Sequence, residues 1–242
     1  MAIRALDYTP ATDLAFGDVL SALITSDLEI RPDDSRYGIR TALRTAFADF
    51  GIAPSSRHGA GDQQGRWEPP DGTMRYDGLH REGLQSDRDE MFRFVWENRA
   101  ALGLCEPAQT VVGAVRPCLR VDGDGFTLRE TVADYVQMLT VRAGELASIP
   151  TPKGRMRAPK GLAPGKTVRL LGGGALVFDE FGALKYHIRN SLLNARKQTA
   201  RLRYLYDTGF FDGRGRAGLG ALHVRALRPD LPACTREPDR WR

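Results

Sequence analysis

Histidine and cysteine most often hold metal ions or carry nucleophilic chemistry, and both are scarce in this sequence. The chain has 242 residues, and no two of its four histidines lie closer than 22 positions. Structural zinc usually takes its ligands from closely spaced pairs. We therefore predict no metal site, no cofactor and no disulfide framework. The histidines are His58, His80, His187 and His223, and the cysteines are Cys105, Cys118 and Cys234.

The segment GLAPGKT, residues 161–167, has part of the pattern of a phosphate-binding loop. Such a loop needs four residues between its first glycine and the Gly-Lys pair, so that successive backbone N–H groups surround the phosphate. Only three residues separate Gly161 from Gly165, and a strand-like run follows where a helix would be needed. We predict that this segment does not bind nucleotides.

Two acidic motifs are better explained by local structure than by chemistry. Asp122–Gly125 (DGDG) lacks the twelve-position ligand spacing of a helix-loop-helix calcium site, and we predict a turn. Asp179 and Glu180 are neighbours, so in a strand they would point to opposite faces. His187 lies on the following run and could pair with a carboxylate across a hairpin. We expect a structural histidine, and an enzyme site using His187, Asp179 and distant residues remains a weaker alternative.

Residues 190–207 (NSLLNARKQTARLRYLYD) have the pattern of a basic amphipathic helix. Basic residues followed by aromatic residues can bind single-stranded nucleic acid through charge and stacking. The simpler interpretation is a solvated basic face with the leucines turned inward, and we favour it. A nucleic-acid-binding module remains the alternative function. Its candidate binding residues are Arg196, Lys197, Arg201 and Arg203, followed by Tyr204 and Tyr206.

The net charge of +5 is unevenly distributed along the chain. Residues 1–150 contain 16 Lys or Arg and 23 Asp or Glu, whereas residues 151–242 contain 19 and 7. A basic half is compatible with an anionic partner. It is equally compatible with packing against the acidic half or with a general preference for arginine, and we favour these simpler explanations.

The elements that would have to position any site are predicted to form an α+β fold. Helical spacing of apolar residues predicts two helices within residues 13–50, with the first capped by Thr12 or Asp13. A third helix is expected at about 87–102. Strand-like runs begin near residue 109, although part of residues 126–143 could be helical, and ALVFD and LKYHI form a hairpin around Gly182.

Helix ends and the long loop have their own signals. The second helix is expected to begin at a cap formed by Asp33, Asp34 or Ser35, and its apolar stripe comprises Ile39, Leu43, Ala46, Phe47 and Phe50. Gly51 is placed to end it. Trp67 is the one expected anchor in the Gly- and Pro-rich residues 53–75. Two amphipathic helices cannot bury their stripes on each other alone, and we expect no third surface nearby in this chain.

Three stretches resemble the C-terminal part of large, mostly uncharacterised bacterial proteins whose N-terminal half is similar to a thermolysin-type (gluzincin) zinc metallopeptidase. They are AIRALDYTP, LAFGDVLSALITSDLEIRPDDSRYGIRTALRTAFADFGIAP and GGGALVFDEFGALKYHIR. In that family a segment like CIRALDYCPPVDITFGDYLRALITAD closes the helical lobe of the peptidase. A β-rich domain follows and ends in a GGATLIVD…VRYAI hairpin. The resemblance is close over residues 2–54 and looser over about 109–205.

The family's zinc chemistry rests on H-E-x-x-H, in which two histidines bind the metal and the glutamate acts as base. This motif is absent here, so the resemblance supplies no catalytic residue. It implies a non-catalytic C-terminal portion, with a truncated gene, a misassigned start or a separately encoded partner. We expect protein association, with a peptidase-like partner or with a second copy, through the helices of residues 13–50.

We predict four parts along the chain. Residues 1–52 form a helix pair resembling the end of a peptidase lobe, residues 53–86 a linker or long loop, and residues 87–207 a domain of β-hairpins with helices. Residues 208–242 form a loosely ordered basic tail. No apolar run is long enough to cross a membrane and no secretory signal begins the chain, so we expect a cytoplasmic location without membrane contact.

Overall fold

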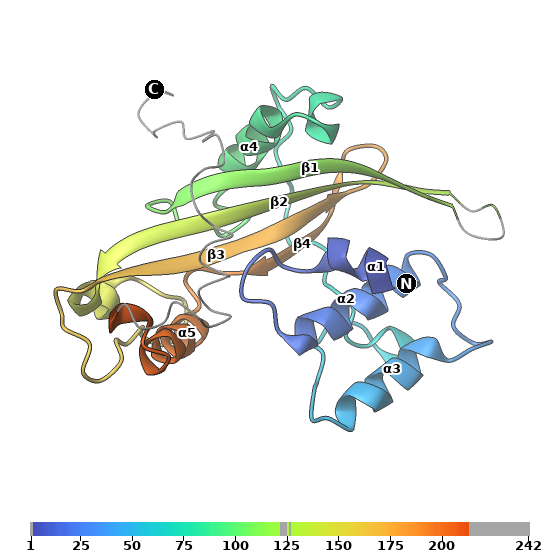
Figure 1. The fold of residues 1–242 in the computed structure, drawn as a ribbon. Helices are drawn as coiled ribbons and strands as arrows, with labels where there is room; N and C mark the ends of the chain where they lie inside the picture. The colour runs from blue at the N-terminus through green and yellow to red at the C-terminus, as the bar shows by residue number, and fades with distance from the viewer. Residues whose placement is uncertain (1, 122–124, 126, 213–242) are drawn as a thin grey trace. The chain divides into compact units, whose positions relative to one another are not determined.

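A computed structural model describes residues 2–121, 125 and 127–212. The fold is α+β, as predicted: helices accompany a four-stranded antiparallel sheet (Figure 1). The helices are α1 (Ala2–Ala5), α2 (Phe16–Leu28), α3 (Ile39–Ala48), α4 (Arg88–Glu97) and α5 (Ala195–Asp207). The strands are β1 (Gln109–Val121), β2 (Thr127–Arg142), β3 (Thr167–Phe178) and β4 (Leu184–Asn190).

The sheet has the order β1-β2-β3-β4, so each strand lies beside the next one in the chain (Figure 1). The predicted hairpin is confirmed, since β3 and β4 pair antiparallel with Leu176 opposite His187. Gly182 takes a φ of 78°, a backbone conformation that glycine adopts without strain, and it closes the turn. The Asp179 carboxylate accepts hydrogen bonds from the backbone N–H groups of Phe181 and Ala183 in the same turn.

Residues 127–142 are wholly extended, so the strand predicted there is confirmed and the helical alternative left open for part of it is not. The β-branched residues of this segment suit a pleated strand, and tertiary pairing selects the strand over any helical tendency. The turn predicted at Asp122–Gly125 lies outside the described residues except for Gly125. Most of the predicted tail, residues 213–242, also lies outside them.

Three successive glycines in β3 allow close backbone approach. A Cβ atom on Gly172 would lie 2.4 Å from the backbone nitrogen of Leu192. A Cβ atom on Gly174 would lie 2.5 Å from the carbonyl oxygen of Ile188 on β4. Both distances are far below van der Waals contact, and the obstructing atoms belong to the backbone. These glycines therefore permit packing that no other residue type would allow.

Helix α2 is largely buried, which corrects the expectation that this chain offers no surface for its apolar stripe. Ala22 belongs to an apolar cluster with Val132 of β2, Val177 of β3 and Ile188 of β4. The sheet is the missing third surface. The strand residues of this cluster lie more than 100 positions after Ala22 in the sequence. The capping prediction is also wrong: the N-cap is Ala15, whose N–H donates to the Asp18 carboxylate.

The segment between α3 and α4 is tied to the N-terminal helices by specific contacts. The Trp67 indole N–H donates to the carbonyl oxygen of Tyr8 at 2.8 Å, and the Trp67 backbone N–H donates to the hydroxyl of Thr25. Trp67 is thus the anchor that the sequence indicated. Helix α4 then begins after Asp87, whose carboxylate accepts a hydrogen bond from the Asp89 N–H.

The described chain forms two compact units, each made of separate chain segments. Unit 1 comprises residues up to 104 together with 112–136 and 173–190, and it contains two apolar clusters. Unit 2 comprises residues 105–111, 137–172 and the segment from 191 onward, and it contains a third apolar cluster. Within the described residues, no helix has the length and apolar character that a membrane span requires.

Candidate functional site

Among the described helices of unit 1, α3 is the one in which no residue of the apolar stripe is fully buried. Arg40 is its only buried residue. We call the five apolar residues of its predicted stripe the α3 stripe. Three of them are half-buried and two are exposed, with Phe50 at 83% exposure. The α3 stripe comprises Ile39, Leu43, Ala46, Phe47 and Phe50.

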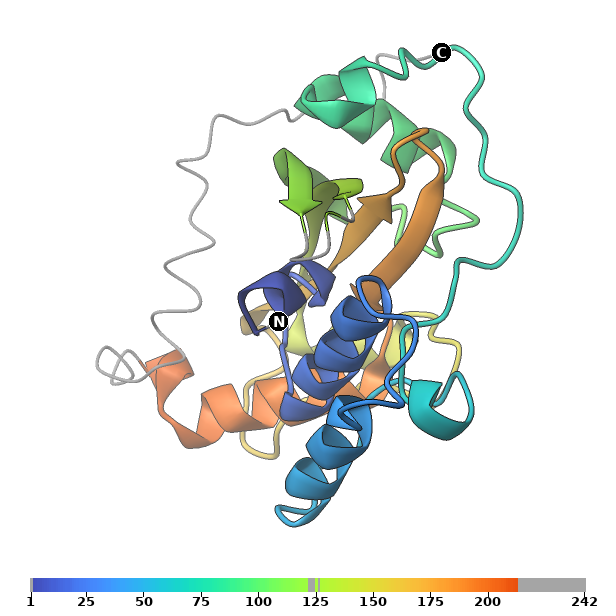
Figure 2. The ribbon, with the colours of Figure 1, turned by 90° about the vertical axis from the view of Figure 1, so that its right-hand side faces the viewer.

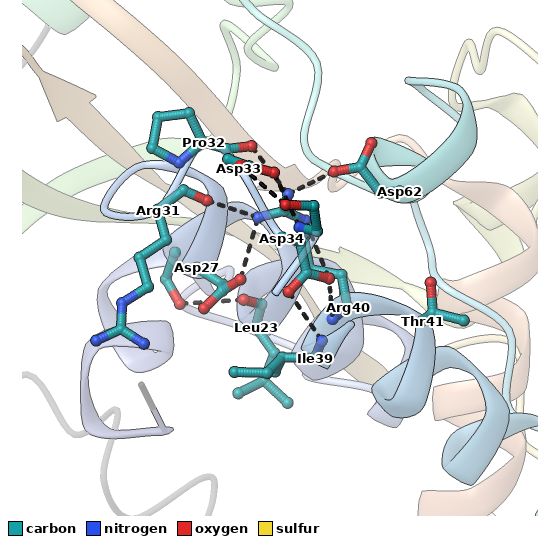
Figure 3. Close-up of polar contacts among 12 residues, drawn as sticks. Leu23, Asp27, Arg31, Pro32, Asp33, Asp34, Ile39, Arg40, Thr41 and Asp62 are labelled. Carbon is teal, nitrogen blue, oxygen red and sulfur yellow. Dashed lines mark hydrogen bonds and ion pairs between the residues drawn. The ribbon is translucent and has the colours of Figure 1, made fainter. Parts of the chain in front are cut away.

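A buried arginine, rather than apolar packing, holds α3 beside α2 (Figures 2 and 3). Arg40 is completely buried, and its guanidinium donates to the Asp27 carboxylate of α2 at 3.1 Å. It also donates to the Asp62 carboxylate at 2.5 Å. Two further hydrogen bonds reach the carbonyl oxygens of Arg31 and Pro32 in the turn between the helices. One side chain therefore fixes α2, the turn and the following loop to α3.

The N-cap of α3 is Gly38, so the prediction of a cap at Asp33, Asp34 or Ser35 is wrong. Asp34 nevertheless contacts the first turn of the helix. Its carboxylate accepts hydrogen bonds from the N–H groups of Ile39 and Arg40 at 2.8 and 2.9 Å. Gly51 ends the helix region as predicted, with a φ of 68°. Burial raises the pKa of Asp27, and the nearby Arg40 guanidinium only partly offsets this effect. The Asp27 carboxylate therefore depends on Arg40 for its compensation.

A second cluster of charged side chains in unit 1 joins α2 to the sheet. The Lys185 ammonium of β4 donates to the Glu130 carboxylate of β2 at 3.2 Å and also to the Glu29 carboxylate. Glu130 has a side chain only 1% exposed, whereas Lys185 is 28% exposed. Burial lowers the pKa of Lys185, but its contacts with Glu29 and Glu130 outweigh burial and raise the pKa overall. Lys185 is therefore held as a cation.

Two tyrosines complete this cluster as hydrogen-bond donors. The Tyr8 hydroxyl donates to Glu130 at 2.6 Å, and the Tyr186 hydroxyl donates to Glu29 at 2.5 Å. Burial is the largest cause that raises the pKa of both phenols, and the neighbouring glutamates add to it. A protonated lysine is not a nucleophile and a protonated tyrosine is not a base. The cluster therefore contributes ion pairs and hydrogen bonds to unit 1, and it holds no free amine or phenolate that could act as a nucleophile or base.

An open hollow of about 550 Å³ lies beside this cluster, with Lys185, Tyr186 and Tyr76 in its lining. The Tyr76 hydroxyl accepts a hydrogen bond from the Leu184 N–H, so its own hydrogen remains available to a neighbour. Because two carboxylates already compensate the Lys185 charge, the hollow offers little attraction for an anion. Its lining also includes the apolar side chains of Pro69, Pro70 and Met74, so it offers apolar contact beside hydrogen bonding.

His187 and Asp179, the pair considered for an enzyme site, have separate partners. His187 Nε2 lies 2.8 Å from the Tyr135 hydroxyl, and the carboxylate of Asp179 is engaged by the hairpin turn. Burial, with a smaller effect from the Arg189 charge, lowers the pKa of His187 to about 3. A neutral imidazole accepting from a protonated tyrosine is a satisfied structural pair.

The four basic residues of the nucleic-acid alternative lie on α5, which begins at Ala195 after Asn194 caps it through the Lys197 N–H. Arg196 and Arg203 are exposed, whereas Lys197 and Arg201 are half-buried. Arg203 lies 3.8 Å from Asp207, and Arg201 donates to the carbonyl oxygen of Arg169. The inner face of α5 buries Leu202 and Leu205, as the simpler interpretation expects.

Sequence patterns did not indicate either of the two charge clusters. Lys185 is separated from Glu29 by 156 positions and from Glu130 by 55, and no local motif connects residues so far apart. The Arg40 cluster had one available signal, because the run IRPDDSRYGIR places two aspartates close to an arginine at the start of a helix. The described residues contain no group of three or more His, Cys, Asp or Glu side chains arranged to hold a metal ion.

Comparison of the chain with protein-family models, with curated proteins and with solved structures finds no match.

Proposed function

We propose that this chain acts by association with another protein through the α3 stripe, and that it contributes no catalytic chemistry to the complex. The observation that carries the proposal is the burial pattern of α3, in which the only buried residue is Arg40. An isolated amphipathic helix of ten residues is not stable in water. Here the Arg40 contacts hold the helix in place, so its apolar stripe remains available to a partner.

The surroundings of α3 support a broader contact area. Ile3, Leu6 and Phe16 of the N-terminal segment are exposed, as is Tyr37 just before α3. Buried aromatic side chains are the residues that most often dominate binding energy in protein interfaces. Phe50 and Phe16, at 83% and 72% exposure, are the aromatic anchors that such an interface would use.

The resemblance of residues 2–54 to the end of a zinc metallopeptidase-like helical lobe identifies the kind of partner. We propose that the α3 stripe packs against the helices of such a lobe, and that this chain is the non-catalytic C-terminal portion of a metallopeptidase-like bacterial assembly. The zinc-binding H-E-x-x-H residues would belong to the lobe.

The test uses a lobe from a protein of that family, ended just before its own CIRALDYCPP-like segment. Titration calorimetry should show this lobe binding the chain in a one-to-one complex. Ala46→Arg combined with Phe50→Arg should weaken the complex at least about tenfold, because it places two charges in the apolar contact. Both positions are exposed, so the variant should retain the fold of the chain.

The matched control combines Thr41→Arg with Ala48→Arg, which adds the same charge to exposed positions on the opposite side of α3. This variant should bind like the original chain. Analytical ultracentrifugation of the chain alone identifies the second candidate partner: a dimer that Ala46→Arg/Phe50→Arg dissociates would make the partner another copy. A monomer that binds no lobe would overturn the proposal.

The basic helix α5 offers a second candidate function. Arg196, Arg203 and Tyr204 are exposed on it, so charge and a stacking surface are available to a single-stranded nucleic acid. The chain should then shift the mobility of DNA, with an affinity for DNA that falls steeply with salt. Replacing the four basic α5 residues with Gln should abolish the shift. A chain that gives no shift at low salt does not have this function.

A further inference from the structure

Unit 2 contains a hollow that the α3 stripe does not explain, and Arg201 is the one basic α5 residue of the nucleic-acid alternative in its lining. It has a volume of about 300 Å³ and lies between β3, α5 and the short turn Phe210–Asp212. Its apolar lining includes Leu171 of β3, Leu205 of α5 and the two rings of Phe210 and Phe211. This size is at the lower end of the range for small-molecule sites, and an apolar wall is their usual lining.

Basic side chains accompany this apolar lining. Lys166, Arg169 and Arg201 are lining residues, and none of the described residues that line the hollow is Asp or Glu. Lys166 donates one hydrogen bond to the carbonyl oxygen of Phe211 at 2.9 Å, which leaves two of its three N–H donors for another partner. Among the described residues, none forms an ion pair with the exposed guanidinium of Arg169.

The charge of the whole unit has the same sign as the charge around the hollow. The described segments of unit 2, residues 105–111, 137–172 and 191–212, contain 11 Lys or Arg and 4 Asp or Glu. This surplus attracts anions toward unit 2 from a distance. It contrasts with the hollow of unit 1, in which two glutamates compensate the single lysine.

We propose that this hollow of unit 2 binds an amphipathic anion, an apolar carboxylate whose chain lies on Leu171, Leu205 and the two phenylalanines. Its head group is bound by Lys166 and Arg169. A lone apolar ligand would make no contact with these cations, and a small hydrophilic anion would leave the apolar wall in contact with water. Only a ligand with both parts satisfies both surfaces. The site is independent of the α3 stripe.

Titration calorimetry of the full chain with sodium decanoate tests this proposal. We expect one molecule to bind per chain. Propionate has the same head group without the chain, and decyltrimethylammonium has the same chain with the opposite charge. Both should bind at least roughly tenfold more weakly than decanoate, since each loses one of the two contacts.

Variants distinguish the head-group contacts from general charge attraction. Arg169→Gln alone, and Lys166→Gln combined with Arg169→Gln, should weaken decanoate binding, the pair by roughly tenfold or more. The matched control is Lys153→Gln combined with Arg155→Gln, which removes the same charge from exposed residues of unit 2 outside the lining. It should change the affinity by less than about twofold. Thr140→Trp should block binding by filling the hollow from β2.

Three outcomes would overturn the proposal. Equal binding of decanoate and decyltrimethylammonium would show an apolar site without anion recognition. Equal weakening by the two double variants would reduce the effect to net charge. A chain that binds a single-stranded oligonucleotide but not decanoate would assign the basic surface of unit 2 to nucleic acid instead. Thermal unfolding monitored by circular dichroism identifies any variant that has lost its fold.

Discussion

Arg40 shows how one residue can decide whether a helix buries its apolar face. Its guanidinium is completely buried, and it contacts two carboxylates and two turn carbonyls (Figure 3). Removing one partner from a buried ion pair leaves the other charge uncompensated, which is far more destabilising than losing a surface pair. Replacing Arg40 with a residue of similar length should therefore lower the stability of the protein more than replacing the exposed residues of the α3 stripe.

We expect Arg40→Met to lower the free energy of unfolding by about 3–5 kcal/mol, because Asp27 stays buried without its cation. Arg44→Met removes an exposed arginine bond to the Asp62 carbonyl and should cost less than about 1 kcal/mol. Urea denaturation of both variants gives the comparison. Adding Asp27→Asn to Arg40→Met should recover part of the loss, and a double variant with fully additive losses would contradict the pairing.

His187 predicts how stability depends on pH. Burial holds its pKa at about 3 in the folded protein, whereas the unfolded chain titrates near 6.5. Between these values only the unfolded state binds the proton, so this residue makes stability fall as the pH falls from about 6.5 toward 3. Above pH 6.5 its contribution is constant. The loss between pH 7 and pH 5 is about 2 kcal/mol.

The variant His187→Gln isolates this contribution, because other groups also titrate in the acid range. Glutamine can still hydrogen-bond to the Tyr135 hydroxyl but has no proton to gain. Denaturation at pH 7 and at pH 5 should show a smaller stability difference for the variant by about 2 kcal/mol. An unchanged difference would mean that His187 is protonated in the folded state as well.

At the scale of elements, the β3–β4 hairpin depends on the absence of a side chain at Gly174. A methyl group there would lie 2.5 Å from the Ile188 carbonyl oxygen, so the two strands would have to separate. We expect Gly174→Ala to destabilise the protein by about 1–3 kcal/mol. Gly165→Ala is the control, because nothing lies within 4 Å of its added Cβ. Thermal unfolding should show a lower midpoint for the first variant only.

Local signals predicted most elements, and distant contacts explain where they failed. The helix at residues 39–48 and the Gly182 hairpin depend on residues within a few positions of each other, and the structure confirms both. Local spacing left both strand and helix open for part of residues 126–143, and strand pairing decides that segment. The burial of α2 could not be predicted, because the strands that cover it lie far along the chain.

The same distinction between local and distant contacts applies to the candidate functional surfaces. The α3 stripe was visible as a helical pattern in the sequence. Its exposure became known only from the structure, in which α2 is largely buried and α3 is not. The clusters around Lys185 and the hollow of unit 2 bring together residues from several separate segments. Spacing along the chain contains no information about such clusters.

At the scale of the whole molecule, unit 1 is built from chain segments that are far apart in the sequence. This arrangement predicts that a fragment of the chain does not fold on its own. Unit 1 combines the first 104 residues with parts of all four strands. In a fragment ending at Leu104, Tyr8 would lose Glu130 and Glu29 would lose Lys185. We expect this fragment to show no cooperative thermal transition by circular dichroism, whereas the full chain shows one. A sharp transition in the fragment would mean that the N-terminal helices fold without the sheet.

The 156 positions between Glu29 and Lys185 also set a time during synthesis. A ribosome adds about 5–20 residues per second, so β4 emerges roughly 10–30 s after α2 has left the exit tunnel. Until β2 emerges the inner face of α2 has no strand to cover it, and β4 completes the covering sheet only at the end of that interval. The nascent chain is therefore a substrate for the chaperones that bind apolar segments at the ribosome, and translation speed governs how long it depends on them.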